Sequence, residues 1–228
     1  MTNRLPPAQP AAAGSAIGRT TGFEPGGRDR AATGSIASAL ERNRKFAAAG
    51  GHEGAVVLPR LQLLVVTCLD PRVDPAHFLG LALGDAIVVR NVGGRVTPEV
   101  IGDVAFIVQM MERALPDGPL FEVAVIHHTQ CGAAALAEHS SRQSYANRIG
   151  ADEAALRDRA VLDPVATVTR DVERLRSADA TLGRVTVSGH VYDVATGLLQ
   201  TILPAGGAPG QQQTQPKPPH HDQAPSGA

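Results

Sequence analysis

Cysteine is scarce in this chain, which has only Cys68 and Cys131 among its 228 residues. A small secreted scaffold held together by disulfides needs more cysteines than this, so that class of protein is excluded. The two residues can still form a single disulfide, pack as buried apolar side chains, or ligate a metal ion. Their number does not decide between these three roles.

Aromatic residues and excess charge are also lacking. The chain has five Phe, two Tyr and no Trp, and its 21 Lys and Arg nearly balance its 22 Asp and Glu, for a net charge of −1. Proteins that bind nucleic acids use basic patches to neutralise phosphates and aromatic side chains to stack on bases. We therefore expect no nucleic-acid partner.

Long apolar runs are absent as well. The most apolar stretch, residues 61–69, is too short to span a bilayer. The N-terminal segment before residue 19 has one Arg and no continuous apolar stretch, so it lacks the usual anatomy of a secretory signal. We expect no membrane association and a cytoplasmic location, where reducing conditions disfavour a lone disulfide.

Proline and glycine, by contrast, are plentiful at both ends of the chain. Residues 1–35 hold four Pro and six Gly, and residues 204–228 hold six Pro and four Gly. These segments cannot bury enough apolar surface to offset the entropy that ordering costs. The sequence therefore predicts two disordered tails, 1–35 and 204–228, around one domain at 36–203 that is long enough for a substantial core.

Strand-like and helix-like segments alternate along this domain. Near-continuous apolar runs predict strands covered on both faces, and Asp-Pro or Thr-Pro pairs predict capped helix starts. The expected strands are residues 61–67, 85–90, 121–127, 184–192 and 198–203. The expected helices are residues 36–49, 74–81, 97–114, 132–138, 143–160 and 163–177. This order predicts an α/β fold with a mainly parallel central β-sheet flanked by helices, and with an antiparallel C-terminal strand.

The two cysteines fall at the ends of predicted strands. Cys68 follows the first strand, Cys131 follows the third, and His128 precedes Cys131 by three residues. The carboxyl ends of parallel strands meet at one edge of the sheet, where ligands bind in such folds. Two thiolates and an imidazole there would form a zinc site with a fourth position open. On these residues alone, buried cysteines and a hydrogen-bonded histidine fit equally well.

A carboxylate and a guanidinium follow Cys68 closely. Asp70 and Arg72 are two residues apart, which favours a charge-assisted pair and keeps Asp70 near the predicted metal position. A capped turn with a surface ion pair of little energetic value is the alternative. Gly93 and Gly94 mark a tight turn that needs positive φ, and such a loop can also wall a small active site.

Taken together, these segments resemble the β-class carbonic anhydrase family. The resemblance covers most of 36–203. It is carried by four stretches: Cys68-Leu-Asp70-Pro-Arg72, Arg90-Asn-Val-Gly93-Gly94, Val125-Ile-His-His128-Thr-Gln-Cys131-Gly132 and Gly189-His-Val-Tyr192-Asp-Val-Ala-Thr-Gly197. Gln130 stands where the family often has Asp, and residues 95–99 depart from the string common in relatives.

The resemblance implies a Zn²⁺ cofactor with Cys68, His128 and Cys131 as ligands. It implies that Asp70 and Arg72 form the catalytic dyad, and that Asp70 becomes a further metal ligand in a closed, inactive state. Three glycines are implied to belong to the substrate pocket: Gly93, Gly94 and Gly132. His127 is expected to support the ligands from behind or to be a packed histidine, because strand alternation turns it away from His128 and only His128 has the three-residue spacing to Cys131.

The implied activity is the zinc-dependent, reversible hydration of CO₂ to bicarbonate and a proton by a zinc-bound hydroxide. The implied partners are CO₂ and bicarbonate and a second copy of the chain, as a homodimer or a dimer-based oligomer. Two alternatives stay open. One is a zinc hydrolase of the same fold that acts on CS₂ or COS. The other is a catalytically silent, zinc-binding structural protein, although a purely structural zinc would not need Arg72 beside Asp70.

Overall fold

The computed structural model describes residues 35–114, 116, 121–178 and 185–206. The chain divides between Gly51 and His52 into two compact units, each of which is described by itself. The first contains helix α1 (Ser35–Ala48), and the backbone N–H of Gly51 donates to the carbonyl of Phe46 just beyond its end. The predicted helix at 36–49 is therefore confirmed. The predicted tails lie almost entirely outside the described residues, so the domain limits stay a prediction.

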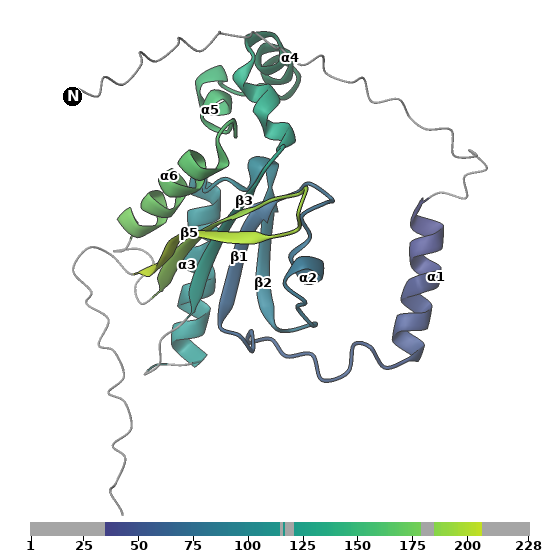
Figure 1. Cartoon of the computed structure of the whole chain (residues 1–228). Coiled ribbons are helices and arrows are strands. Elements are labelled where there is room, and N and C mark those ends of the chain that lie inside the picture. Colours follow the sequence, from purple (N-terminus) through teal and green to yellow (C-terminus); the bar gives the residue numbers. More distant parts are fainter. Residues whose placement is uncertain (1–34, 115, 117–120, 179–184, 207–228) are drawn as a thin grey trace, which may run out of the picture. The chain divides into compact units, whose positions relative to one another are not determined.

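The second unit is built on one five-stranded sheet in the order β2-β1-β3-β4-β5 (Figure 1). Its strands are β1 (Leu63–Cys68), β2 (Ala86–Asn91), β3 (Glu122–His128), β4 (Thr186–Tyr192) and β5 (Leu199–Gly206). The first four pair in parallel, and β5 runs antiparallel to β4. The predicted fold class is confirmed. The register places Cys68 opposite Asn91 and His128 opposite Tyr192, so these residues share the carboxyl edge of the sheet.

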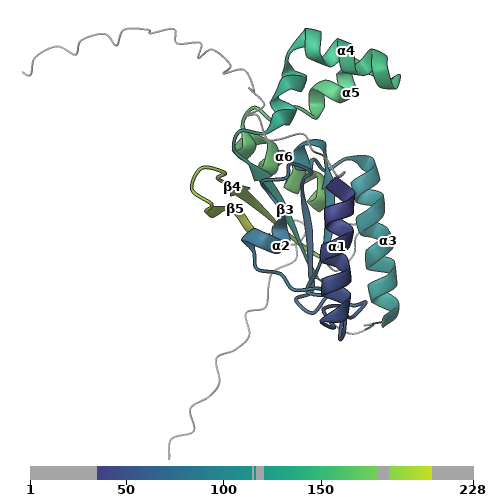
Figure 2. The ribbon, with the colours of Figure 1, turned by 90° about the vertical axis from the view of Figure 1, so that its right-hand side faces the viewer.

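Two long helices cover one face of this sheet (Figure 2). They are α3 (Pro98–Ala114) and α6 (Pro164–Ser177). Their buried side chains pack on alternate residues of the strands: Leu64, Val66, Val123, Val125, Val187 and Val191. Burial of such side chains is the main favourable term in folding. The apolar runs of the sequence thus become the centre of the core.

The other face carries a smaller cluster under a single helical turn, α2 (Pro75–Phe78). Phe78 stacks on Tyr192 of β4, with ring centroids 4.5 Å apart. Asp74 caps α2 by accepting a hydrogen bond from the Ala76 N–H at 3.0 Å, as its position before Pro75 predicts. The helix ends at Phe78 rather than at residue 81.

The segments beyond the carboxyl edge differ most from the sequence prediction. Residues 143–160 form no single helical stretch, because α4 (His139–Ile149) and α5 (Glu153–Asp158) are separate helices. Gly150 ends α4 in the left-handed conformation at φ 65°, and the Asp152 side chain caps α5. Two short 3₁₀ helices complete this edge: η1 (Val92–Gly94) and η2 (Gly132–Ala137). η2 confirms that residues 132–138 are helical, and it ends at Ala137.

Strand limits also shift by a few residues. β1 begins at Leu63 because Gln62 has a φ of 49°, which is not extended backbone. β1 and β3 end on Cys68 and His128 themselves, and β5 continues to Gly206. Within the described part of the chain, the helices are all too short or too polar to cross a bilayer.

Candidate metal centre

Three potential metal ligands meet at the carboxyl edge of the sheet. Cys68 ends β1, His128 ends β3, and Cys131 follows His128 by three residues. All three are buried, and their ligand atoms lie within 4.8 Å of one another. The two Sγ atoms are 3.9 Å apart. Two Zn–S bonds of about 2.3 Å at a tetrahedral angle would separate the sulfurs by about 3.8 Å, so the pair has the spacing that zinc requires.

The ring of His128 presents a free nitrogen to this group. Its Nδ1–H donates to the carbonyl of Thr129 at 2.9 Å, which leaves Nε2 unprotonated in the neutral ring. Nε2 is buried and has no hydrogen-bond partner among the described residues. An unpaired buried nitrogen costs free energy, whereas a metal ion would use its lone pair. The residues present therefore fit a bound zinc ion.

The two thiols share their protons unequally. A hydrogen bond from the Cys131 S–H to the Cys68 thiolate lowers the pKa of Cys68 to about 4, against the effect of burial. The same contact raises the pKa of Cys131. The first proton of the pair therefore leaves readily and the second is held. A divalent cation would favour loss of the second proton as well, because metal-bound thiols are deprotonated.

Asp70 and Arg72 form the ion pair that their spacing predicts. Arg72 Nε donates to Asp70 Oδ1 at 3.0 Å, and Arg72 Nη2 donates to Asp70 Oδ2 at 2.7 Å. These bonds lower the pKa of Asp70 to about 2, so the carboxylate is ionised near neutral pH. Arg72 Nη2 also donates to the carbonyl of Gln130, which ties the pair to the loop before Cys131. Asp70 lies outside the group formed by the two sulfurs and the imidazole.

Arg90 holds the loop that carries these residues. From β2, its Nε donates to the carbonyl of Cys68 at 3.0 Å, and its Nη2 donates to the carbonyl of Asp70 at 2.7 Å. Its Nη1 lies 3.4 Å from Asp74 Oδ2. Sequence reasoning gave Arg90 no role. Its place directly after the apolar part of the second strand, at the same edge as Cys68, was the available signal.

Gly93 and Gly94 form a tight turn beside the site, just after the end of β2. Gly93 and Gly94 have φ values of 82° and 66°, as the tight turn requires. The side chain of Asn91 closes this turn by bonding both the N–H and the carbonyl of Arg95 at 2.8 Å. A Cβ on Gly94 would stand 2.8 Å from the backbone nitrogen of Cys68. Gly94 therefore permits the close approach of this turn to the end of β1.

A cavity of about 400 Å³ opens beside the metal group. Cys68, Asp70, Gly93 and Gly132 line it, together with mostly apolar side chains of η1, η2 and α4. Two of the three glycines predicted for the pocket thus border it. Gly94 instead packs against the backbone of β1.

Known proteins of similar sequence and structure indicate the family of this chain. Residues 63–151 match the family model described as carbonic anhydrase. Beta-carbonic anhydrase 1 of Mycobacterium tuberculosis is 27% identical over 157 residues, which cover 68% of this chain and 91% of that protein. The solved carbonic anhydrase of Streptococcus mutans superposes with a TM-score of 0.61 and is 29% identical, covering 75% of this chain and 99% of the other.

The family model and these relatives support the β-carbonic anhydrase family. A carbon disulfide hydrolase of an Acidianus strain is also similar, with 26% identity over 158 residues, 59% of this chain and 74% of that protein. The resemblance stated from the sequence is thus confirmed, and with it the assignment of the chain to a family of carbonic anhydrase enzymes. The roles of its individual site residues stay predictions.

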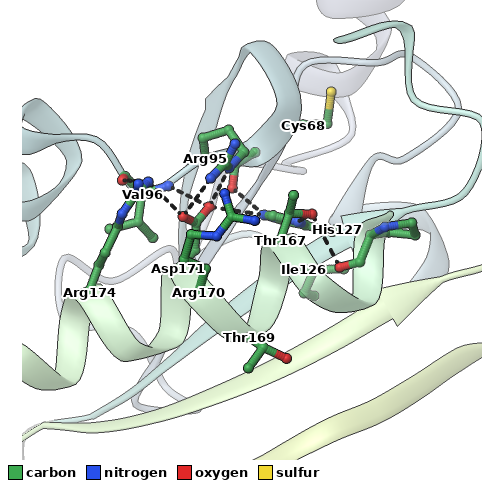
Figure 3. A network of polar contacts seen from close by, with 12 residues as sticks. Cys68, Arg95, Val96, Ile126, His127, Thr167, Thr169, Arg170, Asp171 and Arg174 are labelled. Carbon is green, nitrogen blue, oxygen red and sulfur yellow. Dashed lines mark hydrogen bonds and ion pairs between the residues drawn. The ribbon is translucent and has the colours of Figure 1, made fainter. Parts of the chain in front are cut away.

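Sequence reasoning missed one polar network of this chain (Figure 3). His127 lies on the opposite face of β3 from His128, as alternation predicts, and its Nδ1 is 2.8 Å from Thr167 Oγ1. Its Nε2 is 3.3 Å from a carboxylate oxygen of Asp171 on α6, which also pairs with Arg95. Asp171 comes 76 residues after Arg95 in the chain, so local sequence carries no sign of this contact.

Proposed function

We propose that the protein catalyses the reversible hydration of CO₂ to bicarbonate and a proton, with Zn²⁺ bound by Cys68, His128 and Cys131. The observation that carries the proposal is the unpartnered, buried Nε2 of His128 beside two sulfurs at zinc-like spacing. The names of the relatives support the reaction. The intact Asp70–Arg72 pair argues against a purely structural zinc.

Bound zinc would supply a Lewis acid that lowers the pKa of a coordinated water toward neutrality. Asp70 contributes an ionised carboxylate beside the metal group, which accepts hydrogen bonds and cannot donate them. Arg72 engages both oxygens of Asp70 and so fixes the direction of the remaining lone pairs. Asp70 would orient the attacking water by accepting one of its protons in a hydrogen bond.

The proposed second role of Asp70, as a metal ligand in a closed state, has a cost set by these contacts. Both Arg72 bonds and the bond from the backbone N–H of Arg72, 2.9 Å from Asp70 Oδ1, would have to be broken or rearranged. Charge-assisted bonds of this kind are stronger than neutral ones. We therefore expect the paired arrangement to be the ground state at neutral pH.

The experiment that tests the proposal combines stopped-flow CO₂ hydration with a zinc measurement on the same sample. We expect about one zinc per chain and rapid hydration in the wild type. Asp70→Asn removes the charge but keeps the size of the side chain, so zinc should stay while most of the turnover is lost. Near-normal turnover in Asp70→Asn would reject the role of Asp70. A wild type that holds zinc but is inactive across the pH range would favour the structural alternative.

A homodimer, or an oligomer built from dimers, is part of the same proposal. Among the described strands, β2 pairs on one side only, with β1, and Val88 on it is 40% exposed. Such an edge can accept another strand or chain. Light scattering should give at least twice the mass of the chain, and a fully active monomer would contradict the dimer. We also propose a cytoplasmic location, where the two thiols would stay reduced.

Hydrolysis of CS₂ is a second candidate, favoured by one observation. The cavity beside Cys68 and Asp70 is lined largely by apolar side chains, and CS₂ is a linear, apolar analogue of CO₂. The similarity to a carbon disulfide hydrolase supports it. Sulfide release from CS₂ in the absence of CO₂ hydration would favour this reading, and the reverse result would favour carbonic anhydrase activity.

A further inference from the structure

Asp171 is the most heavily bonded buried carboxylate in the described part of the chain. It lies on α6 with its side chain fully buried. Arg95 donates to both of its oxygens at 2.6 and 3.0 Å, and the Val96 N–H and Arg174 Nη1 each donate at 3.0 Å (Figure 3). Burial raises the pKa of Asp171, but the bonds from His127 and Arg95 outweigh it and lower the value to about 2. The carboxylate is therefore ionised inside the protein.

Apart from Arg174 on α6 itself, the donors around Asp171 come from two segments next to the metal group. Arg95 and Val96 directly follow the Gly93–Gly94 turn. His127 directly precedes His128 on β3. α6 supplies no metal-group ligand itself, so Asp171 joins the two segments from outside the site.

Gly94 is held from two sides. On one side it packs so closely on β1 that a Cβ would stand 2.8 Å from the Cys68 nitrogen. On the other side its carbonyl is 3.2 Å from His127 Nε2, which is also 3.3 Å from Asp171. Since Nε2 faces two acceptors, it carries the hydrogen. A shift of Asp171 would therefore displace Gly94, and the displaced Gly94 would move the backbone of Cys68.

Stability alone is a weak reason for this arrangement. Taking two charges out of water costs about as much free energy as their attraction returns, and apolar replacements of such pairs are often as stable. An ionised carboxylate with all its hydrogen bonds made holds its donors in a fixed geometry. Hydrogen-bond partners of metal ligands orient those ligands in the same way.

We propose that Asp171 is a positioning residue for the metal centre: acting through Arg95 and His127, it sets the placement of Cys68 and His128 and thereby the affinity and geometry of metal binding. Asp171 lies outside the metal group and acts only through other residues. The inference rests on the proposed function only in its claim that the cluster binds zinc.

The test uses the full-length chain with Asp171→Asn, which keeps the size of the side chain and removes its charge. Zinc affinity is measured by competition with a chromophoric chelator. We expect the zinc Kd to rise roughly 10–100-fold, the usual effect of losing a partner behind the ligands. In cobalt-exchanged protein, the visible absorption bands should also change in position or intensity, because they report the geometry around the metal. A role limited to fold stability would leave these bands unchanged.

Val172→Ala is the matched control. Val172 is the next residue on α6, fully buried, and lies against Gly189 of β4 in the apolar core. Its truncation should lower the melting temperature while the zinc Kd and the cobalt spectrum stay as in the wild type. The proposal is overturned if Asp171→Asn changes the Kd no more than Val172→Ala does and leaves the spectrum intact.

Arg95→Lys covers the case in which Asp171→Asn does not fold. The lysine keeps the positive charge but its single ammonium cannot span both carboxylate oxygens as Arg95 does. The same rise in Kd and the same spectral change are expected, and a wild-type Kd and spectrum would overturn the proposal. The readouts also separate the two hypotheses. A wild type that binds zinc without hydrating CO₂ defeats the proposed function only, and one that binds neither zinc nor cobalt defeats both.

Discussion

His128 illustrates how single contacts prepare a ligand. Its Nδ1–H is taken by the carbonyl of the next residue, and its Nε2 is left buried and unpartnered. Cys68 and Cys131 then provide two sulfurs on the same side. At the scale of the residue, the site is defined by which atoms already have a hydrogen-bond partner and which are free to bind a metal.

Removal of this imidazole should therefore remove the metal. We expect His128→Ala to lose most of its zinc, because two thiolates alone leave the site two ligands short of the usual four. Metal analysis of the purified protein is the measurement. The control is His139→Ala, whose side chain is 68% exposed and outside the group. A full complement of zinc in His128→Ala would disprove the ligand assignment.

Gly94 is the second residue on which the site depends. Gly94→Ala would place a Cβ 2.8 Å from backbone atoms of Thr67 and Cys68 at a φ of 66°. Strain and overpacking should together cost about 3 kcal/mol in the free energy of unfolding.

Chemical denaturation measures this cost, and Gly102→Ala is the control. Gly102 lies on α3 with open space around its Cβ position, so alanine there should be neutral or stabilise by up to about 1 kcal/mol. Equal effects of the two substitutions would show that the turn does not press on β1.

At the scale of the element, α6 is the helix that joins the core to the site. Its start is readable from the sequence, because Asp163 before Pro164 is a capped beginning and Asp163 accepts from the N–H groups of Val165 and Ala166 at 2.9 and 3.0 Å. Its inner face packs Val168, Val172 and Leu175 on the sheet. The same face carries Asp171. The apolar pattern of the helix predicts its buried face but does not indicate the role of this carboxylate.

The cap of α6 gives an element-scale prediction. Asp163→Ala should lower the free energy of unfolding by about 1 kcal/mol, because two N–H groups lose their acceptor. Asp163→Ser keeps an acceptor and should recover most of the loss. Urea denaturation of the three proteins is the measurement, and an unchanged midpoint in Asp163→Ala would show that the cap contributes nothing.

At the scale of the whole molecule, the buried charge of Asp171 makes stability depend on pH. Its pKa is lowered from 3.8 to about 2 in the folded chain. A group with a depressed folded pKa stabilises the protein above its unfolded pKa, and this contribution is lost as pH falls through the folded value. It amounts to about 2 kcal/mol that should disappear between about pH 4 and pH 2.

Urea denaturation between pH 2 and pH 5, with a chelator present, measures this dependence. Asp171→Asn should be less stable at pH 5 and should show a shallower decline by about 2 kcal/mol over the interval. Asp103→Asn, on the exposed side of α3, should follow the wild type. Parallel curves for Asp171→Asn and the wild type would contradict the prediction.

The parts of the molecule that were predictable are those encoded by local spacing. Burial on both faces makes β1 and β3 continuous apolar runs, and the Cys68-x-Asp70-x-Arg72 spacing brings the carboxylate and guanidinium together within one turn. The helix limits within residues 143–160 were harder to predict. The break at Gly150 depends on a left-handed backbone conformation, which the polar pattern of this stretch does not indicate.

The sequence by itself therefore determined the fold class, the family and the residues that meet at the sheet edge, because each of these depends on periodicity or on neighbours within a few positions. Only the tertiary structure decided how these residues are held. Arg90 donates hydrogen bonds to the carbonyls of Cys68 and Asp70, and Arg95 donates to Asp171. The bonded residues are 20 to 76 positions apart in the chain. Such contacts arise from the packing of α6 and β2 against the rest of the sheet, which is set by the burial of the whole core rather than by any segment of it.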